Sequence, residues 1–169
     1  MASRTCKSEI VDDKGNIMKT FFKLILITFS FSITNLTLAG EPVSTGFFSI
    51  SAIGQHDTTA YHLDKKAQKG EKRFVHEWKG AKWNFATEEQ RDLFAANPEK
   101  YSPAYNGYCS NALTLDEGLI PTDGAVWQMF GDQLHLFFSE RGRVRWVNGN
   151  YEELKAEADA AWKYELSKR

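Results

Sequence analysis

The sequence contains few cysteines and no excess of charge of either sign. Cys6 and Cys109 are the two cysteines among 169 residues, and neither belongs to a spacing typical of zinc sites, such as Cys-x-x-Cys. The 21 Lys and Arg residues nearly balance the 22 Asp and Glu residues, which excludes a general nucleic-acid footprint, so we expect no nucleic-acid partner. Motifs for a nucleophile elbow, a phosphate-binding loop or a zinc protease are also absent from the sequence, so an unrecognised enzyme is a minority hypothesis.

Residues 18–39 have the plan of a secretory signal peptide. A basic start at Met18-Lys19 is followed by the apolar run 24–33 and by a small-residue cleavage site at Thr37-Leu38-Ala39. The run is shorter than the roughly 20 apolar residues that a spanning helix needs, so we expect no permanent membrane span after signal cleavage. Residues 1–17 form an upstream extension. The protein is then expected to be periplasmic or secreted, with Cys109 as its one thiol and no internal disulfide.

Residues 41–169 are enough for one domain with a real core, and we expect a small single domain of the α+β class. Two β-hairpins are predicted to form its antiparallel sheet. The first covers 73–86 about the turn Lys79-Gly80, and the second covers 126–138 about Gly131-Asp132. The first register pairs Trp78 with Ala81, Glu77 with Lys82, His76 with Trp83 and Phe74 with Phe85; the second pairs Trp127 with Leu136, Met129 with Leu134 and Gln128 with His135.

Alternation along the first hairpin places its aromatic residues and His76 on an apolar face, and Glu77, Lys82 and Asn84 on the opposite face. Thr87-Glu88-Glu89-Gln90 has the form of a capping box that starts a short helix to about Ala96, which would bury Leu93 and Phe94. A C-terminal amphipathic helix from Asn150 onward carries Leu154, Ala158, Trp162 and Leu166 on one face. We expect this helix to pack on the sheet.

Several segments, in this order and spacing, resemble the exported YHS-domain proteins of bacteria. They are Gly54-Gln55-His56-Asp57-Thr58-Thr59-Ala60-Tyr61, His76-Glu77-Trp78, Trp83-Asn84-Phe85, Asn97-Pro98-Glu99-Lys100-Tyr101 and Gly107-Tyr108-Cys109. The core of the resemblance covers residues 47–112 of a YHS-like domain at 41–169. Metal-handling members of that family carry cysteines at positions that fall here on Ala60, Ala86 and Gln90. Neither alanine has a donor atom and a Gln amide is a poor ligand for a soft metal, so the family's usual thiolate site does not carry over.

The resemblance implies a transition metal (copper, zinc, nickel or iron), which here would need a relocated site. Cys109, His56 and His62 are the leading candidate ligands, with Asp57 and His76 as secondary candidates. Structural interpretations exist for His56, His76 and Cys109, and for His135 as well; His56 would cap or close its turn. His76 on an apolar strand face is typical of a core histidine, Cys109 is equally a small buried hydrophobe, and His135 opposite Gln128 is expected to form a surface or half-buried polar pair.

A basic cluster at Arg141, Arg143 and Arg145 invites the interpretation of an anion site. Residues two apart do not share a helix face, so a solvated surface is the preferred interpretation. The leading functional hypothesis is therefore a small exported binding module that binds or traffics a transition metal. The alternatives are a metal-free module that binds an organic ligand or a protein partner, and an unrecognised enzyme.

Overall fold

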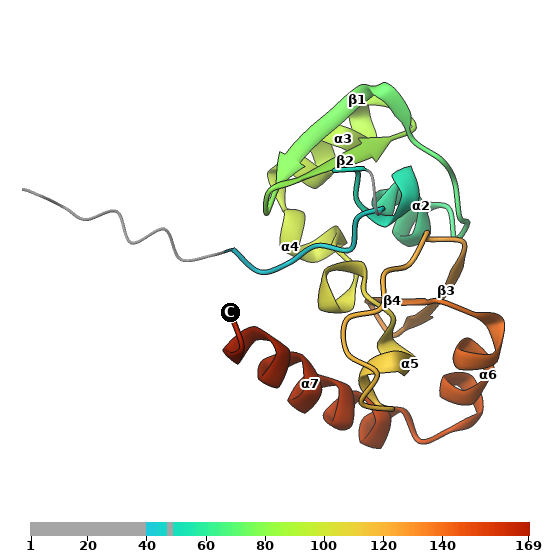
Figure 1. Ribbon diagram of the computed structural model, residues 1–169. Coiled ribbons are helices and arrows are strands. Elements are labelled where there is room, and N and C mark those ends of the chain that lie inside the picture. Colours follow the sequence, from blue (N-terminus) through green and yellow to red (C-terminus); the bar gives the residue numbers. More distant parts are fainter. Residues whose placement is uncertain (1–39, 47–48) are drawn as a thin grey trace, which may run out of the picture. The chain divides into compact units, whose positions relative to one another are not determined.

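The computed structural model describes residues 40–46 and 49–169, and these form the small α+β domain that the sequence predicts (Figure 1). The expected upstream extension at 1–17 and the expected signal peptide at 18–39 lie outside the described residues. Within the described part of the chain, no helix combines the length and the apolar character that crossing a membrane requires.

The first hairpin consists of β1 (Glu71–Trp78) and β2 (Ala81–Phe85). Its turn is the predicted one, because Lys79 and Gly80 both have positive φ angles, 49° and 72°, as a tight primed turn requires. The pairs nearest the turn are confirmed: Trp78 with Ala81, Glu77 with Lys82 and His76 with Trp83. The predicted pair of Phe74 with Phe85 is wrong. A bulge between Glu71 and Val75 shifts the register, so that Phe85 lies opposite Glu71.

Short helices surround this hairpin: η1 (Ile53–Gln55) and α2 (Thr58–Leu63) before it, and α3 (Glu88–Ala96) and α4 (Pro98–Tyr101) after it. The hydroxyl of Thr87 accepts a bond from Gln90 N and so caps α3 as predicted. The second half of the predicted capping box does not form, because the Gln90 side chain turns to Asp64 instead. Phe94 is buried as expected, but the prediction for Leu93 is wrong, since Leu93 is 42% exposed.

The rest of the chain contains η2 (Ala104–Gly107), α5 (Ser110–Leu113), β3 (Val126–Phe130), β4 (Gln133–Phe137), α6 (Glu140–Asn148) and α7 (Tyr151–Ser167). All three predicted pairs of the second hairpin are confirmed. The two hairpins, however, do not join into one sheet. Each forms its own two-stranded antiparallel sheet. The terminal helix α7 lies mainly against α5 and α6, and it reaches the second hairpin where Tyr151 stacks on Phe130, with ring centroids 4.5 Å apart.

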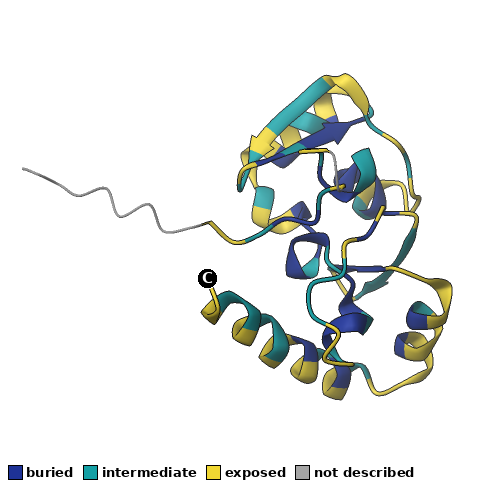
Figure 2. Cartoon of the chain, in the orientation of Figure 1, coloured by how far each residue is buried: buried dark blue, intermediate teal, exposed yellow. Residues whose placement is uncertain are grey.

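Two hydrophobic clusters contain most of the buried hydrophobic residues of the domain (Figure 2). The first cluster lies between the first hairpin, α2 and α3, and contains Tyr61, Trp83, Phe85 and Phe94. The second joins η2, α5, β4, α6 and α7 through Phe137, Trp146 and Ala158. Leu134 and Leu136 of β4 belong to the first cluster while Phe137 belongs to the second, so β4 contributes to both. The hydrophobic effect therefore holds both hairpins in one domain although their strands do not pair.

Candidate functional site

The residues predicted as metal ligands lie at three places in the fold: at α2, on β1 and before α5. His56 and Asp57 immediately precede α2, His62 lies within α2, His76 lies on β1, and Cys109 immediately precedes α5. Among residues 40–46 and 49–169, no three or more His, Cys, Asp or Glu side chains are grouped so that they could hold a metal ion. The contacts of each candidate show what it does instead.

Asp57 is a structural clamp. One carboxylate oxygen accepts bonds from Thr59 N at 2.9 Å, from the Thr59 hydroxyl at 2.6 Å and from Ala60 N at 3.3 Å, which caps α2. The other oxygen accepts from Ala86 N at 2.8 Å, at the end of the first hairpin. Asp57 is fully buried, and both of its carboxylate oxygens accept bonds from protein donors, so the residue serves to join α2 to the first hairpin.

The histidines near α2 are held by packing. His56 is buried, its Nδ1 lies 3.3 Å from Ile53 O, and burial is the main cause that lowers its pKa. His62 packs edge-on against the Tyr101 ring with centroids 5.5 Å apart, and burial again lowers its pKa. His62 Nε2 is buried without a hydrogen-bond partner among the described residues. One such nitrogen does not make a metal site without further donors beside it.

Cys109 and His76 also make contacts of a structural kind. Cys109 is 3% exposed, and its Sγ accepts a bond from Phe138 N at 3.2 Å. His76 is half-buried and lies edge-on to Phe94, with centroids 5.8 Å apart, as expected for a histidine on the apolar face of the hairpin. The described residues thus do not bring the predicted ligands together.

The expectation for His135 is wrong, although its register is right. His135 lies opposite Gln128 but is fully buried, 0% exposed. Its Nδ1 lies 3.0 Å from Ser110 Oγ, and its Nε2 lies 3.4 Å from the Tyr151 hydroxyl. Aromatic rings of η2, β3, α6 and α7 enclose it: Tyr105, Phe130, Trp146 and Tyr151.

This enclosure lowers the pKa of His135 to about 4, because burial disfavours the charged imidazolium and Lys155 adds a smaller repulsion. A serine beside a histidine is the arrangement of a nucleophile and its base. Ser110 is also fully buried, however, so the pair offers no space for a substrate. We interpret Ser110, His135 and Tyr151 as a buried structural network.

The basic cluster on α6 separates as its spacing predicts. Arg143 makes ion-pair contacts with Glu140 and donates to Gln128 Oε1 at 2.9 Å. Arg141 and Arg145 lie four residues apart and line a different pocket, where Arg145 donates to Asn111 Oδ1 at 3.0 Å. A single site for all three guanidinium groups does not form.

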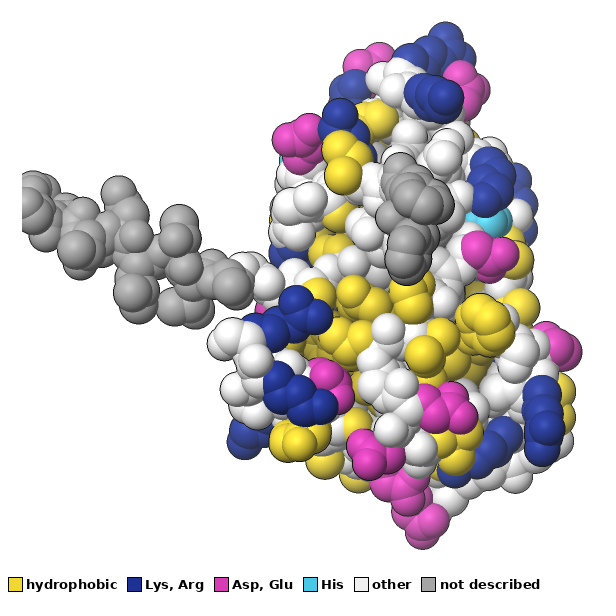
Figure 3. Space-filling view, in the orientation of Figure 1, with side chains coloured by type: hydrophobic (Ala, Val, Ile, Leu, Met, Phe, Trp, Pro, Cys, Tyr) yellow, Lys and Arg dark blue, Asp and Glu magenta, His cyan; other side chains and the backbone are white. Residues whose placement is uncertain are grey.

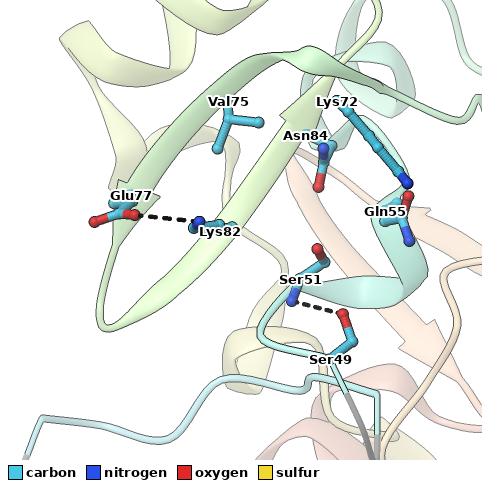
Figure 4. A pocket seen from close by; sticks show the side chains of 8 residues that line it. All are labelled: Ser49, Ser51, Gln55, Lys72, Val75, Glu77, Lys82 and Asn84. Carbon is cyan, nitrogen blue, oxygen red and sulfur yellow. Dashed lines mark hydrogen bonds and ion pairs between the residues drawn. The ribbon is translucent and has the colours of Figure 1, made fainter.

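The outer face of the first hairpin carries a polar pocket of about 590 Å³ (Figure 4). Its walls come from β1, β2 and the segment 49–55, and its lining residues are Ser49, Ser51, Gln55, Lys72, Val75, Glu77, Lys82 and Asn84. The predicted alternation explains part of this set, since Glu77, Lys82 and Asn84 were expected on this face. The remaining wall is a tertiary feature that the sequence pattern does not show.

Backbone bonds fix segment 49–55 beside β2. Ala52 N donates to Lys82 O, and Lys82 N donates to Ile50 O, both at 2.8 Å. Gly70, just before β1, approaches the backbone of Asn84 on β2 very closely. A Cβ at Gly70 would lie 2.3 Å from the backbone carbon of Asn84, so a side chain does not fit there.

Asn84 is the most informative residue of this pocket. It is only 4% exposed, and its Nδ2 donates to Glu71 O at 3.3 Å. Its Oδ1 is buried and has no hydrogen-bond partner among the described residues. Gln90 Oε1 is likewise a buried amide oxygen without a partner among the described residues, but Asn84, unlike Gln90, lines this pocket, where a donor from outside the protein would satisfy its oxygen.

Charge in the pocket is unevenly distributed. Lys82 lies 3.9 Å from the carboxylate of Glu77, and Figure 4 shows this pair at the end of the pocket away from Lys72. Lys72 has no carboxylate within 4.0 Å in the described part of the chain. The Lys72 end of the pocket, next to Gln55 and Asn84, is therefore positive.

A second surface feature is apolar. Phe138 is 71% exposed and borders a groove of about 400 Å³ with Pro121, Thr45 and Gly46 among its lining residues. Figure 3 shows hydrophobic side chains gathered in the middle of one face of the domain. Exposed apolar patches are typical of contact surfaces. If the protein binds a protein partner, this patch is where the partner would bind.

No family model, curated protein or solved structure significantly matches this chain. The resemblance to YHS domains therefore stays a prediction from the sequence motifs.

Proposed function

We propose that this protein is a non-catalytic binding module that holds a small, polar organic ligand, without a metal, in the pocket on the outer face of the first hairpin. The observation that carries the proposal is the buried and unpaired Oδ1 of Asn84 in the wall of that pocket. This is the metal-free alternative that the sequence left open, and it takes the place of the relocated metal site as the leading hypothesis.

A buried acceptor without a donor costs a folded protein about 1–3 kcal/mol, and a ligand that donates to it removes this penalty on binding. The pocket volume of about 590 Å³ falls in the range common for small-molecule sites. Serine, glutamine, asparagine and lysine side chains around the pocket supply further polar contacts.

Two other hypotheses have less support. A metal site would need donors that converge, whereas Asp57 and Cys109 are engaged in local hydrogen bonds and His56 and His62 are held by packing. The enzyme hypothesis would rest on Ser110 and His135, which are both sealed in the interior. If the predicted YHS family is correct, this chain would be a member without the usual thiolate site.

The test is native mass spectrometry together with elemental analysis of the untagged protein, purified from its source. We expect a bound small organic molecule in the wild-type protein and its loss in Asn84→Ala. Gln128→Ala, on the second hairpin, is the matched control and should retain the molecule. A wild-type protein that carries near-stoichiometric copper, zinc, nickel or iron and no organic molecule would contradict the proposal.

A further inference from the structure

The pocket on the first hairpin makes two separate demands on a ligand, and both can be stated from the residues that line it. The first demand comes from Asn84. Its Nδ2 is held by Glu71 O, which fixes the orientation of the side-chain amide and leaves the oxygen as the unpaired atom. A matching ligand must therefore present an N–H or O–H donor at this point.

The second demand comes from charge. The ammonium group of Lys72 lies at the pocket without an ion-pair partner among the described residues, whereas Lys82 has the carboxylate of Glu77 at 3.9 Å. Figure 4 shows the Lys72 side chain reaching toward Gln55, on the same side of the hairpin as the Asn84 amide. A single compact ammonium beside neutral amides and hydroxyls suits a singly charged carboxylate.

Both residues line the same end of one pocket, so one ligand group can meet both demands. An N-acylated α-amino acid does so, because its amide N–H and its carboxylate are attached to the same carbon atom. The remaining wall, formed by Val75 and the small hydroxyls of Ser49 and Ser51, leaves room for the acyl part.

We propose that the Lys72 and Asn84 end of this pocket recognises the N-acyl-α-amino-acid group, with Asn84 Oδ1 accepting from the amide N–H and Lys72 binding the carboxylate. The inference rests on the proposed function and names the ligand class of the same site. This group occurs in free N-acylated amino acids and at the C-terminus of peptides. Both contain the amide N–H and the carboxylate that Asn84 and Lys72 would bind.

The experiment is an NMR titration of the full ¹⁵N-labelled chain that follows the side-chain amide of Asn84 in the wild-type protein and the backbone amides of the pocket residues Ser51 and Lys82 in the wild-type protein and all variants. The probe is N-acetylglycine, and two analogues each lack one of the recognised groups. N-acetylsarcosine lacks the amide N–H, and N-acetylglycinamide lacks the carboxylate. We expect N-acetylglycine to shift the Asn84 resonances in a saturable way, and each analogue to bind at least about tenfold more weakly.

Variants test whether Asn84 causes the preference for the amide N–H and Lys72 the preference for the carboxylate. Asn84→Ala should abolish the preference for N-acetylglycine over N-acetylsarcosine, and Lys72→Gln should abolish the preference over N-acetylglycinamide. Lys163→Gln, on α7 and outside the pocket, should leave both preferences unchanged. The comparison of the three probes on the wild-type protein needs no variant, so a variant that fails to fold does not remove the test.

Binding of N-acetylsarcosine or N-acetylglycinamide as tight as that of N-acetylglycine would overturn the inference. No binding of N-acetylglycine up to about 50 mM would also overturn it. In either case a different organic molecule retained in native mass spectrometry would leave the proposed function standing. N-acetyl-triglycine separates the two sources: about tenfold tighter binding than N-acetylglycine indicates a peptide C-terminus, and equal binding indicates a free N-acyl amino acid.

Discussion

Acid should destabilise this protein through His135, which is buried in the second hydrophobic cluster. In the folded state the pKa of His135 is lowered to about 4, chiefly by burial. The groups that face it from the surrounding elements are the hydroxyls of Ser110 and Tyr151, the charges of Lys155 and Asp159, and four aromatic rings. In the unfolded chain the same imidazole titrates at its ordinary pKa near 6.5.

The direction of the pH dependence follows from proton uptake by the imidazole of His135. Above about pH 6.5 the imidazole is neutral in both states, so its titration leaves the free energy of unfolding unchanged. Between about pH 6.5 and 4 the unfolded state binds a proton that the folded state excludes, and stability falls as the pH falls. At about 1.4 kcal/mol per pH unit, the pKa difference corresponds to a loss of about 3 kcal/mol by pH 4. Domains of this kind are typically stable by only about 5–15 kcal/mol, so the loss is large.

The assay is urea unfolding followed by tryptophan fluorescence at a series of pH values from 7 to 4. Wild-type protein alone is not sufficient, because the pKa values of His56 and His62 are lowered in the same direction. The variant His135→Gln keeps a polar group beside Ser110 but does not titrate. Phe137→Leu, a neighbouring core change that should cost about 1–2 kcal/mol at every pH, is the control.

We expect the wild-type protein to lose about 3 kcal/mol more than His135→Gln between pH 7 and 4. The Phe137→Leu variant should follow the wild-type curve at a constant offset. If the difference between wild type and His135→Gln stays flat over this range, the argument that burial keeps His135 neutral is refuted.

Three further predictions concern individual positions. Gly70→Ala should lower the free energy of unfolding by about 2–4 kcal/mol, because its Cβ would lie 2.3 Å from the Asn84 backbone. Gly80→Ala, with open space around it, should lower it by only about 1 kcal/mol. Thermal unfolding compares the two variants, and equal losses would contradict the close approach of Gly70 to β2. Asp57→Asn should lose about 1–3 kcal/mol in urea unfolding, because an amide N–H₂ would face Ala86 N–H; a neutral effect would show that the clamp is dispensable. Cys109 should react with Ellman's reagent at least about 100-fold more slowly in the folded protein than in urea, and fast reaction would show an accessible thiol.

Local patterns predicted much of the secondary structure. The turn at Lys79-Gly80 and the hydroxyl cap of Thr87 depend on residues a few positions apart, and both are confirmed. The second half of the capping box failed because Gln90 meets Asp64, which is 26 residues away in the sequence. The expected pair of Phe74 with Phe85 failed because a bulge changes the register, and the alternation of apolar residues does not show a bulge.

The candidate site was predictable only in part. Alternation placed Asn84 on the outer face of the hairpin, but the burial of its amide depends on how Gly70 and segment 49–55 pack beside β2. Cys109 and His56 were predicted as metal ligands from the chemistry of their side chains. Side-chain type does not show that Cys109 accepts a bond from Phe138 N or that His56 lies against Ile53 O.

The sequence by itself determined the two hairpins with their turns and the starts of α3 and α7, because those features depend on hydrogen bonds and periodicities within a few residues. Tertiary structure alone decided what covers each face. Ser110 lies 25 residues from the His135 that it contacts, and the wall opposite Asn84 comes from residues about thirty positions earlier in the chain. His135 was expected at the surface or half-buried and is a core residue, and the oxygen of Asn84 is buried without a partner among the described residues, because the environment of a polar atom depends on segments that are distant in the sequence.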